Sequence, residues 1–137
     1  PGWSREGAGA FDQSLARSLL HHISGRPARL ALLREAAGLL RPGGGLVLSA
    51  WQVRHVPRLA AKIRPWAEVG LDPAGLEEGD LLMTWGEGDR GRRYVHELRA
   101  EELAALCREA GLAVAESWRS DGETGDMGLY LLCRRGE

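Results

Sequence analysis

The side chains best suited to bind an anion are gathered in one short segment of the sequence. Arg90, Arg92 and Arg93 are followed closely by Tyr94 and His96. A guanidinium group presents a planar fork of N–H donors that fits a carboxylate or a phosphate. This segment could contact the phosphates of a nucleic acid. The alternative is a run of arginines that is merely solvated.

Two histidines and a tryptophan follow expected strands and form a second group of candidates. His21 and His22 come directly after the expected strand at 11–20, and Trp51 ends the next one. Open α/β sheets bind their ligands beyond the carboxyl ends of the strands. We therefore expect one of the two histidines, and Trp51, to line a ligand site. The alternatives are histidines bonded to the backbone and a tryptophan packed in the core.

Composition excludes several classes of protein. The 137 residues are 44% apolar and 27% charged, with a net charge of -1, which is typical of a globular domain without a polybasic tail. Cys107 and Cys133 lie far apart in apolar segments, which favours buried thiols in a reducing compartment. No metal site is expected, because no histidine lies at ligand spacing from a cysteine. No segment is long and apolar enough for a membrane span, so we expect a cytoplasmic protein.

The clearest expected element is a helix over residues 24–41. Ser24 is its expected N-cap, and Pro27 falls in its first turn, where a missing N–H group costs nothing. Its apolar stripe consists of Leu30, Leu33, Ala37 and Leu40. Arg29 lies off this stripe.

The remaining pattern predicts an α/β fold. Strands are expected at 11–20, 45–51, 112–118 and 128–134, and a second helix at 99–110. Residues 52–93 are expected to form an irregular insert with one short helix around 59–66. This order predicts a mainly parallel sheet that ends in an antiparallel hairpin. Arg17 is awkward inside a buried strand. Gly43, Gly44 and Gly45 follow a helix and precede a strand, so they indicate a structural turn and not a phosphate loop.

Three segments together resemble a known fold family. Residues 11–24 (FDQSLARSLLHHIS), 39–44 (LLRPGG) and 47–51 (VLSAW) are similar to the second half of class I S-adenosylmethionine (SAM) methyltransferases. The resemblance implies a partial methyltransferase domain over 1–137, with 52–93 as an insert on the substrate side. It implies SAM as cofactor and the C-terminal half of a Rossmann-like sheet.

Two further segments resemble one subfamily. Residues 79–85 (GDLLMTW) are similar to the D-(V/L)-L-V-P-W of tRNA wobble-uridine carboxyl methyltransferases. Residues 93–98 (RYVHEL), with Glu102 and Leu103, resemble their R-Y-Y-H-x-F-…-E-L. That family, which includes the methyltransferase half of an AlkB-type fusion protein, methylates the carboxylate of a 5-carboxymethyl uridine in the anticodon. The resemblance implies tRNA as a partner, a small activator protein as a second partner, and no membrane.

The resemblance also implies roles for particular residues. The implied catalytic residues are Arg93, Tyr94 and His96. The implied cofactor-binding residues are Leu20, His21 and His22. The implied substrate-binding residues are Trp51, Asp80, Trp85 and Arg92. A carboxyl group with a pKa of about 4 is already ionised at neutral pH, so its methylation needs no general base. It needs hydrogen-bond donors that hold the carboxylate in line with the methyl group of SAM.

Strand geometry puts a condition on this site. If residues 93–96 are extended, Arg93 and Val95 share one face, and Tyr94 and His96 share the other. The side chains of Arg93, Tyr94 and His96 can then reach one pocket only if the backbone turns between them. We therefore expect a turn or bulge near Tyr94.

Three rival interpretations stay open at this point. One is a methyltransferase that acts on a small molecule or a lipid. Another is a fragment of an active enzyme. The third is a non-catalytic partner or degenerate copy, because the family's glycine-rich SAM loop and ribose-binding acid do not occur in this sequence. For the same reason the chain by itself is expected to bind SAM weakly and to be inactive.

Overall fold

The computed structural model describes residue 9 and residues 11–136. Its strands are β1 (Phe11–Ala16), β2 (Leu40–Trp51), β3 (Ile63–Arg64), β4 (Asp80–Trp85), β5 (Gly91–His96), β6 (Leu112–Ser120) and β7 (Gly128–Arg135). Its helices are α2 (Arg26–Leu39), α3 (Pro57–Ala60) and α4 (Ala100–Glu109). Short 3₁₀ turns connect them, including one at Leu20–His22.

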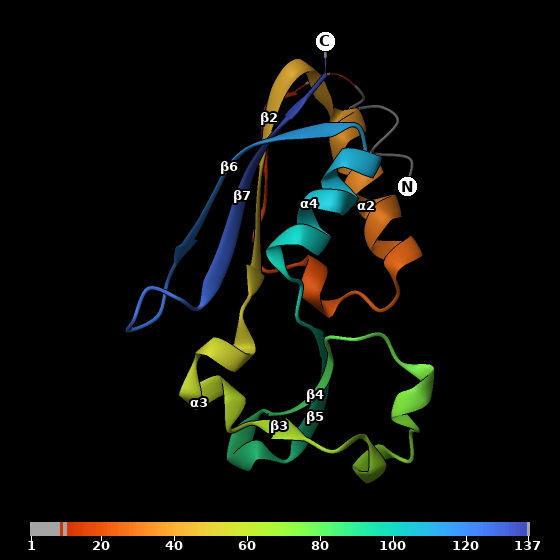
Figure 1. Cartoon of the computed structure of the whole chain (residues 1–137), viewed down its shortest axis with the longest axis vertical. Helices are drawn as coiled ribbons and strands as arrows, with labels where there is room; N and C mark the ends of the chain where they lie inside the picture. Colours follow the sequence, from red (N-terminus) through yellow and green to blue (C-terminus); the bar gives the residue numbers. More distant parts are fainter. Residues whose placement is uncertain (1–8, 10, 137) are drawn as a thin grey trace.

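The larger sheet has the strand order β1-β2-β7-β6. β1 pairs with β2 in parallel, and β7 is antiparallel to both β2 and β6. Three strands therefore run in one direction and β7 runs in the other, which confirms the expected mainly parallel sheet with a final antiparallel hairpin. Helices α2 and α4 lie together on one face of this sheet (Figure 1).

The main core lies between these two helices and the sheet. Leu33 and Ala37 of α2, with Leu103 and Leu106 of α4, pack against alternate residues of β2 and β7. Burial of each leucine stabilises the fold by roughly 1.5–3 kcal/mol. The helix α2 has Gly25 and not Ser24 at its N-cap, with no side-chain hydrogen bond there. The expected position of a proline in its first turn is confirmed.

The start of β2 explains the glycine cluster. β1 and β2 shift register between Phe11 and Gln13, so residues 41–44 bulge out of the ladder. A Cβ on Gly44 would lie 2.9 Å from the carbonyl oxygen of Arg41 and 3.1 Å from that of Asp12. Only glycine fits this approach, which supports the structural interpretation of the cluster.

β1 is an edge strand and is shorter than expected. It ends at Ala16, so Arg17 lies outside it, with 59% of its side chain exposed. The Arg17 guanidinium donates to the Tyr130 hydroxyl at 3.3 Å. The predicted conflict between Arg17 and a buried strand therefore does not arise. Phe11 and Leu15 are also exposed, by 51% and 63%.

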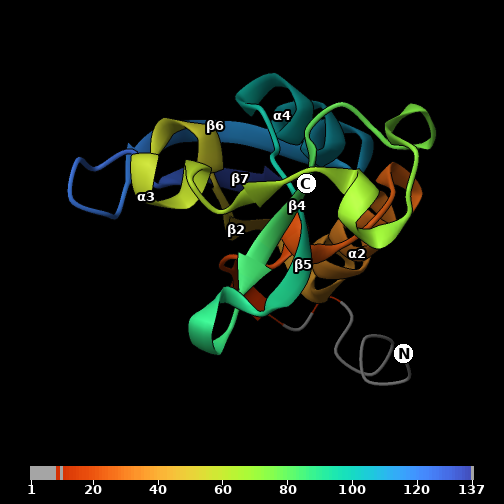
Figure 2. The ribbon, with the colours of Figure 1, turned by 90° about the horizontal axis from the view of Figure 1, so that it is seen from below.

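The expectation of an irregular insert is wrong. β3, β4 and β5 form a second, antiparallel sheet that extends the ordered structure through residue 96. The expected helix around 59–66 is replaced by α3, by β3 and by a 3₁₀ turn at Trp66–Val69. This smaller sheet lies at the carboxyl ends of β1 and β2 and carries its own apolar cluster around Met83 and Val95 (Figures 1 and 2).

None of the described helices combines the length and the apolar character that a bilayer crossing needs.

Candidate active site

The pairing of β4 with β5 decides where the candidate side chains point. Asp80 lies opposite His96, and Met83 lies opposite Arg93, in an unbroken ladder. The turn or bulge that we expected near Tyr94 is absent from this ladder. Because side chains alternate along a strand, Arg93 and Val95 lie on one face while Tyr94 and His96 lie on the other.

Arg93 lies among aromatic rings on the first face. Its guanidinium carbon is 4.3 Å from the centre of the Trp85 ring and 5.8 Å from that of Trp51. One of its terminal nitrogens lies 2.8 Å from Nε2 of His22. We call Arg93, His21, His22, Trp51 and Trp85 the Arg93 shelf. Within the described residues no carboxylate lies within ion-pair distance of Arg93, whereas neighbouring Arg92 is paired.

The two histidines of the shelf are held neutral. His21 is fully buried and stacks on Trp51, with ring centres 4.5 Å apart. Its Nδ1 accepts a hydrogen bond from the Trp51 backbone N–H at 3.3 Å. Burial, aided by the neighbouring His22 and Arg93, lowers the pKa of His21 from 6.5 to about 3. Burial and the charge of Arg93 also lower the pKa of His22.

The three residues expected to bind SAM differ in access. Leu20 and His21 are buried, and His22 is half-buried. Nε2 of His21 is a buried donor that has no acceptor in the described part of the chain. A buried N–H without a partner costs about 1–3 kcal/mol. This atom fits a site that an added acceptor would complete, so the 3₁₀ turn is compatible with one wall of a cofactor site.

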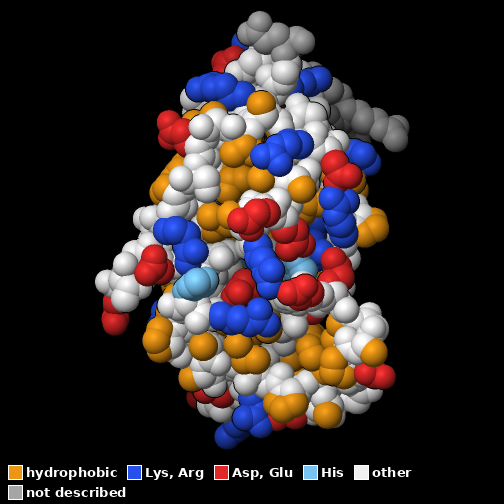
Figure 3. All heavy atoms as spheres, in the orientation of Figure 1, with side chains coloured by type: hydrophobic (Ala, Val, Ile, Leu, Met, Phe, Trp, Pro, Cys, Tyr) orange, Lys and Arg blue, Asp and Glu red, His pale blue; other side chains and the backbone are white. Residues whose placement is uncertain are grey.

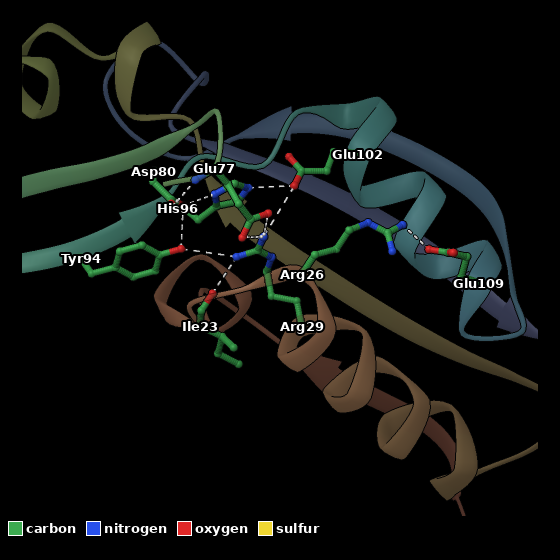
Figure 4. A network of polar contacts seen from close by, with 9 residues as sticks. All are labelled: Ile23, Arg26, Arg29, Glu77, Asp80, Tyr94, His96, Glu102 and Glu109. Carbon is green, nitrogen blue, oxygen red and sulfur yellow. Dashed lines mark hydrogen bonds and ion pairs between the residues drawn. The ribbon is translucent and has the colours of Figure 1, made fainter. Parts of the chain in front are cut away.

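The opposite face of β5 carries a polar network with a different character. The Tyr94 hydroxyl donates to Oδ1 of Asp80 at 2.7 Å. His96 is fully buried, and its two ring nitrogens lie 2.6 Å from Asp80 and 2.8 Å from Glu102. Because both partners are carboxylates, a proton on either ring nitrogen of His96 has an acceptor. Figure 4 shows these contacts together with Arg29 and Glu77.

The pKa values on this face follow from its contacts. Burial of the Asp80 carboxyl group opposes its ionisation, but the hydrogen bonds from Tyr94 and His96 outweigh burial and lower its pKa below the ordinary value. Burial, with the hydrogen bond to ionised Asp80, raises the pKa of Tyr94 to about 12. Tyr94 therefore stays protonated at neutral pH.

The structure separates the residues that we expected in one pocket. Of the implied catalytic residues, only Arg93 lies on the shelf, because Tyr94 and His96 point into the polar network. Of the implied substrate residues, Trp51 and Trp85 lie on the shelf, with Trp85 exposed by 40%. Asp80 belongs to the network. Arg92 donates to Glu68 at 2.8 Å and to the carbonyl oxygen of Asp89 at 3.1 Å.

An acidic hollow adjoins the network. It has a volume of about 680 Å³. It is lined by Glu77, Glu78, Glu97, Arg99, Glu101 and Glu102. Acidic and basic side chains are mixed over the middle of the molecule in the space-filling view (Figure 3). Most carboxylates of the hollow are paired within the protein, as Glu77 is with Arg29 and Glu78 with Arg99, so the hollow offers no free cation to an anionic ligand and the Arg93 shelf is favoured instead.

Glu77, Asp80 and His96 are the described residues whose spacing comes nearest to a metal site. Their ligand atoms lie within 4.8 Å of one another. Both oxygens of Glu77 accept hydrogen bonds from Arg29, and Oδ1 of Asp80 accepts from Tyr94 and His96. The arrangement is a hydrogen-bonded ion network, in which the Arg29 guanidinium occupies the position next to Glu77 that a metal ion would need.

Sequence reasoning missed Arg29 and Glu77. Arg29 is fully buried, although it was expected off the apolar stripe of its helix. A signal was present, because Arg29 is four residues before Leu33, which is four before Ala37, and such residues share a helix face. No comparable pattern marks Glu77, which lies in the connection before β4.

Comparisons with known proteins agree with this fold. No protein-family model matches the sequence. A methyltransferase of Encephalitozoon cuniculi (strain GB-M1) is 30% identical over 107 residues, covering 78% of this chain and 47% of that protein. The ubiquinone biosynthesis O-methyltransferase of Xanthomonas axonopodis pv. citri is 31% identical over 122 residues, covering 84% of this chain and 44% of that protein. The chain thus spans about half the length of these curated relatives.

A solved structure shares the arrangement of elements. The SAM-dependent methyltransferase of Methanosarcina mazei superimposes with a TM-score of 0.70 at 19% identity, over 94% of this chain and 61% of that one. The sheet order, the helices on its face and this superposition agree. The chain has the fold of part of a class I SAM-dependent methyltransferase domain.

Proposed function

We propose that this chain takes part in SAM-dependent methyl transfer, and that the acceptor is the carboxylate of a modified wobble uridine in tRNA. The observation that carries the proposal is Arg93. This half-buried cation lies over Trp85, donates to His22, and has no carboxylate partner among the described residues. A guanidinium in such surroundings is suited to take an anionic group from a ligand.

The shelf provides what a carboxylate acceptor needs. Transfer from a sulfonium to a carboxylate is an in-line displacement that depends on alignment. The Arg93 fork would hold the carboxylate, and the exposed face of Trp85 would stack on a planar base, as aromatic side chains do in RNA recognition. His22, backed by His21, would form part of the wall next to SAM. SAM, when bound, supplies the methyl group.

A small aromatic molecule is the second candidate acceptor. It is favoured by the two tryptophan rings, whose centres lie 5.9 Å apart, and by the O-methyltransferase among the relatives. A phenolic acceptor has a pKa of about 10 and is protonated at neutral pH, so its methylation requires a general base. His22 is a poor base here, because Arg93 already donates to its Nε2 and its pKa is lowered. The carboxylate needs no such base, so we prefer it.

Partners follow from the same proposal. tRNA is the proposed macromolecular partner, and the resemblance supports a small activator protein as a second one. Exposed Arg90, Arg54 and Arg58 lie on elements of the smaller sheet and its neighbours, where they could meet phosphates.

The test is the nucleoside composition of tRNA from a strain that lacks the gene. We expect the unmethylated carboxymethyl uridine to accumulate, and its ester to return when the gene is restored. The gene with Arg93→Lys should restore the ester poorly, whereas Arg90→Lys should restore it fully. An unchanged tRNA profile with loss of a small-molecule methyl ether would instead support the second candidate.

A further inference from the structure

Arg29 is a fully buried arginine that the proposed methyl transfer does not use. One terminal nitrogen donates to the Ile23 carbonyl oxygen at 2.8 Å, and the other donates to both carboxylate oxygens of Glu77 at 2.7 and 2.9 Å. Figure 4 shows this side chain reaching from α2 into the space between helix, turn and smaller sheet. Burial of a guanidinium is costly unless it is paired, so these contacts hold it in one geometry.

The same guanidinium contacts strand β5. Its first nitrogen lies 3.4 Å from the Tyr94 hydroxyl, which in turn donates to Asp80. Glu102 of α4 lies 3.9 Å from its second nitrogen. Arg29 thus joins four segments that are separate in the sequence.

Two of these segments carry the contact at the centre of the shelf. Ile23 follows directly after His22, and Tyr94 follows directly after Arg93. Movement of Ile23 relative to Tyr94 would therefore change the 2.8 Å contact between Arg93 and His22. We infer that Arg29 is a positioning residue, which sets the contact between Arg93 and His22 by fixing β5 against the histidine turn. The importance of Arg29 for a substrate rests on the proposed function, whereas its effect on the position of Arg93 does not.

The alternative is that Arg29 only stabilises the fold. Helix α2 offers a control for this, because Arg26 forms an exposed ion pair with Glu109 of α4 (Figure 4). That pair also joins α2 to α4, but it lies away from the turn and from β5. A second control is Leu131→Ala in the main core, which weakens the fold and lies on β7, a strand that carries no residue of the network.

The experiment measures nuclear Overhauser contacts between the Arg93 guanidinium and the His22 ring by NMR in the full chain. One terminal nitrogen of Arg93 lies 2.8 Å from Nε2 of His22, so these contacts should be strong. We expect Arg29→Met to abolish most of them. Arg29→Lys should retain only part of them, because an ammonium lacks the fork that spans Ile23 and Glu77. Arg26→Met should leave them intact.

The controls separate positioning from stability. Leu131→Ala should lower the melting temperature at least as much as Arg29→Met while it leaves the contacts between Arg93 and His22 in place. If Arg29→Met does not fold, Tyr94→Phe decides, since it removes the link to β5 and keeps the ring; we expect weaker contacts between Arg93 and His22. Unchanged contacts in the folded Arg29 or Tyr94 variant, or equal changes in Leu131→Ala, would overturn the inference. No methylation is measured, so failure of the proposed function would not affect this result.

Discussion

Strand β5 holds its charged side chains in two different ways on its two faces. On one face, His96 is buried between two carboxylates, and the nearby Arg29 has both oxygens of Glu77. On the other face, Arg93 lies against tryptophan rings and a neutral histidine, without a carboxylate partner in the described part of the chain. On the first face, each charged side chain is paired within the protein. On the second face, the Arg93 guanidinium is available to an anionic ligand.

This difference assigns a structural role to the paired charges and a ligand-binding role to Arg93, which the residue types alone could not do. A buried, paired charge fixes elements relative to one another, because breaking the pair leaves its partner uncompensated. A partly exposed, unpaired guanidinium beside an aromatic ring is free to bind. Loss of a network residue should therefore change stability first, and loss of a shelf residue should change ligand binding or turnover first.

The largest expected effect is on the network. Glu77→Gln would leave the guanidinium of Arg29 buried without its closest carboxylate. We expect the free energy of unfolding to fall by about 3 kcal/mol, at the lower end for a broken buried pair, because Ile23 and Glu102 still contact it. Urea denaturation measures this. Glu78→Gln, which disturbs only an exposed pair with Arg99, should have little effect, and equal losses in both variants would contradict the comparison.

The next effect is on the shelf. Arg93→Lys replaces a planar fork by a point charge, and the lost charge-assisted hydrogen bond is worth ~1.5–3 kcal/mol. Under the proposed function, kcat/KM for the carboxylate acceptor should fall about ten- to hundredfold, with the free energy of unfolding nearly unchanged. Arg90→Lys is the matched control. If both variants lost activity equally, Arg93 would be one of several phosphate contacts.

A smaller effect is expected from the exposed tryptophan of the shelf. Trp85→Leu removes the ring under Arg93, an interaction worth about 0.5–1 kcal/mol at a partly exposed site. Binding of a planar anionic ligand, followed by calorimetry, should weaken several-fold. Trp118 is exposed to nearly the same degree but stacks on Tyr130 of the larger sheet. Trp118→Leu should leave binding unchanged, and a similar loss there would argue against the shelf.

The smallest change near neutral pH concerns the protonation of His21. Its pKa in the folded protein is about 3, below 6.5 in the unfolded chain. Its neutral form therefore contributes stability above pH 6.5, and that contribution is lost as the pH falls toward 3. Between pH 5 and 8, nitrogen-detected NMR should show His21 only as the neutral Nε2–H tautomer. A charged ring at pH 5 would contradict the burial that holds the shelf together.

The main elements of the fold were predictable from local patterns. The stripes of α2 and α4 and the apolar run of β2 follow directly from the spacing of leucines. The final hairpin follows from two apolar runs joined by a polar loop. Proline and glycine also mark the end of the first helix, although β2 already begins at Leu40 and these residues form a bulge within it. These features depend on neighbours in the sequence, so one sequence sufficed to place them within a few residues.

The division of the site depended on tertiary structure. The sequence identified Arg93, Tyr94, His96, Asp80 and Trp85 as candidates, but it could not show that residues 80–96 form a regular hairpin, because the glycines at 86, 88 and 91 hid the strands. Once β4 pairs with β5, alternation sends these side chains to opposite faces. The burial of Arg29 was decided in the same way, since only the tertiary structure brings the connection before β4, with the Glu77 carboxylate, against α2 and makes a buried guanidinium tolerable.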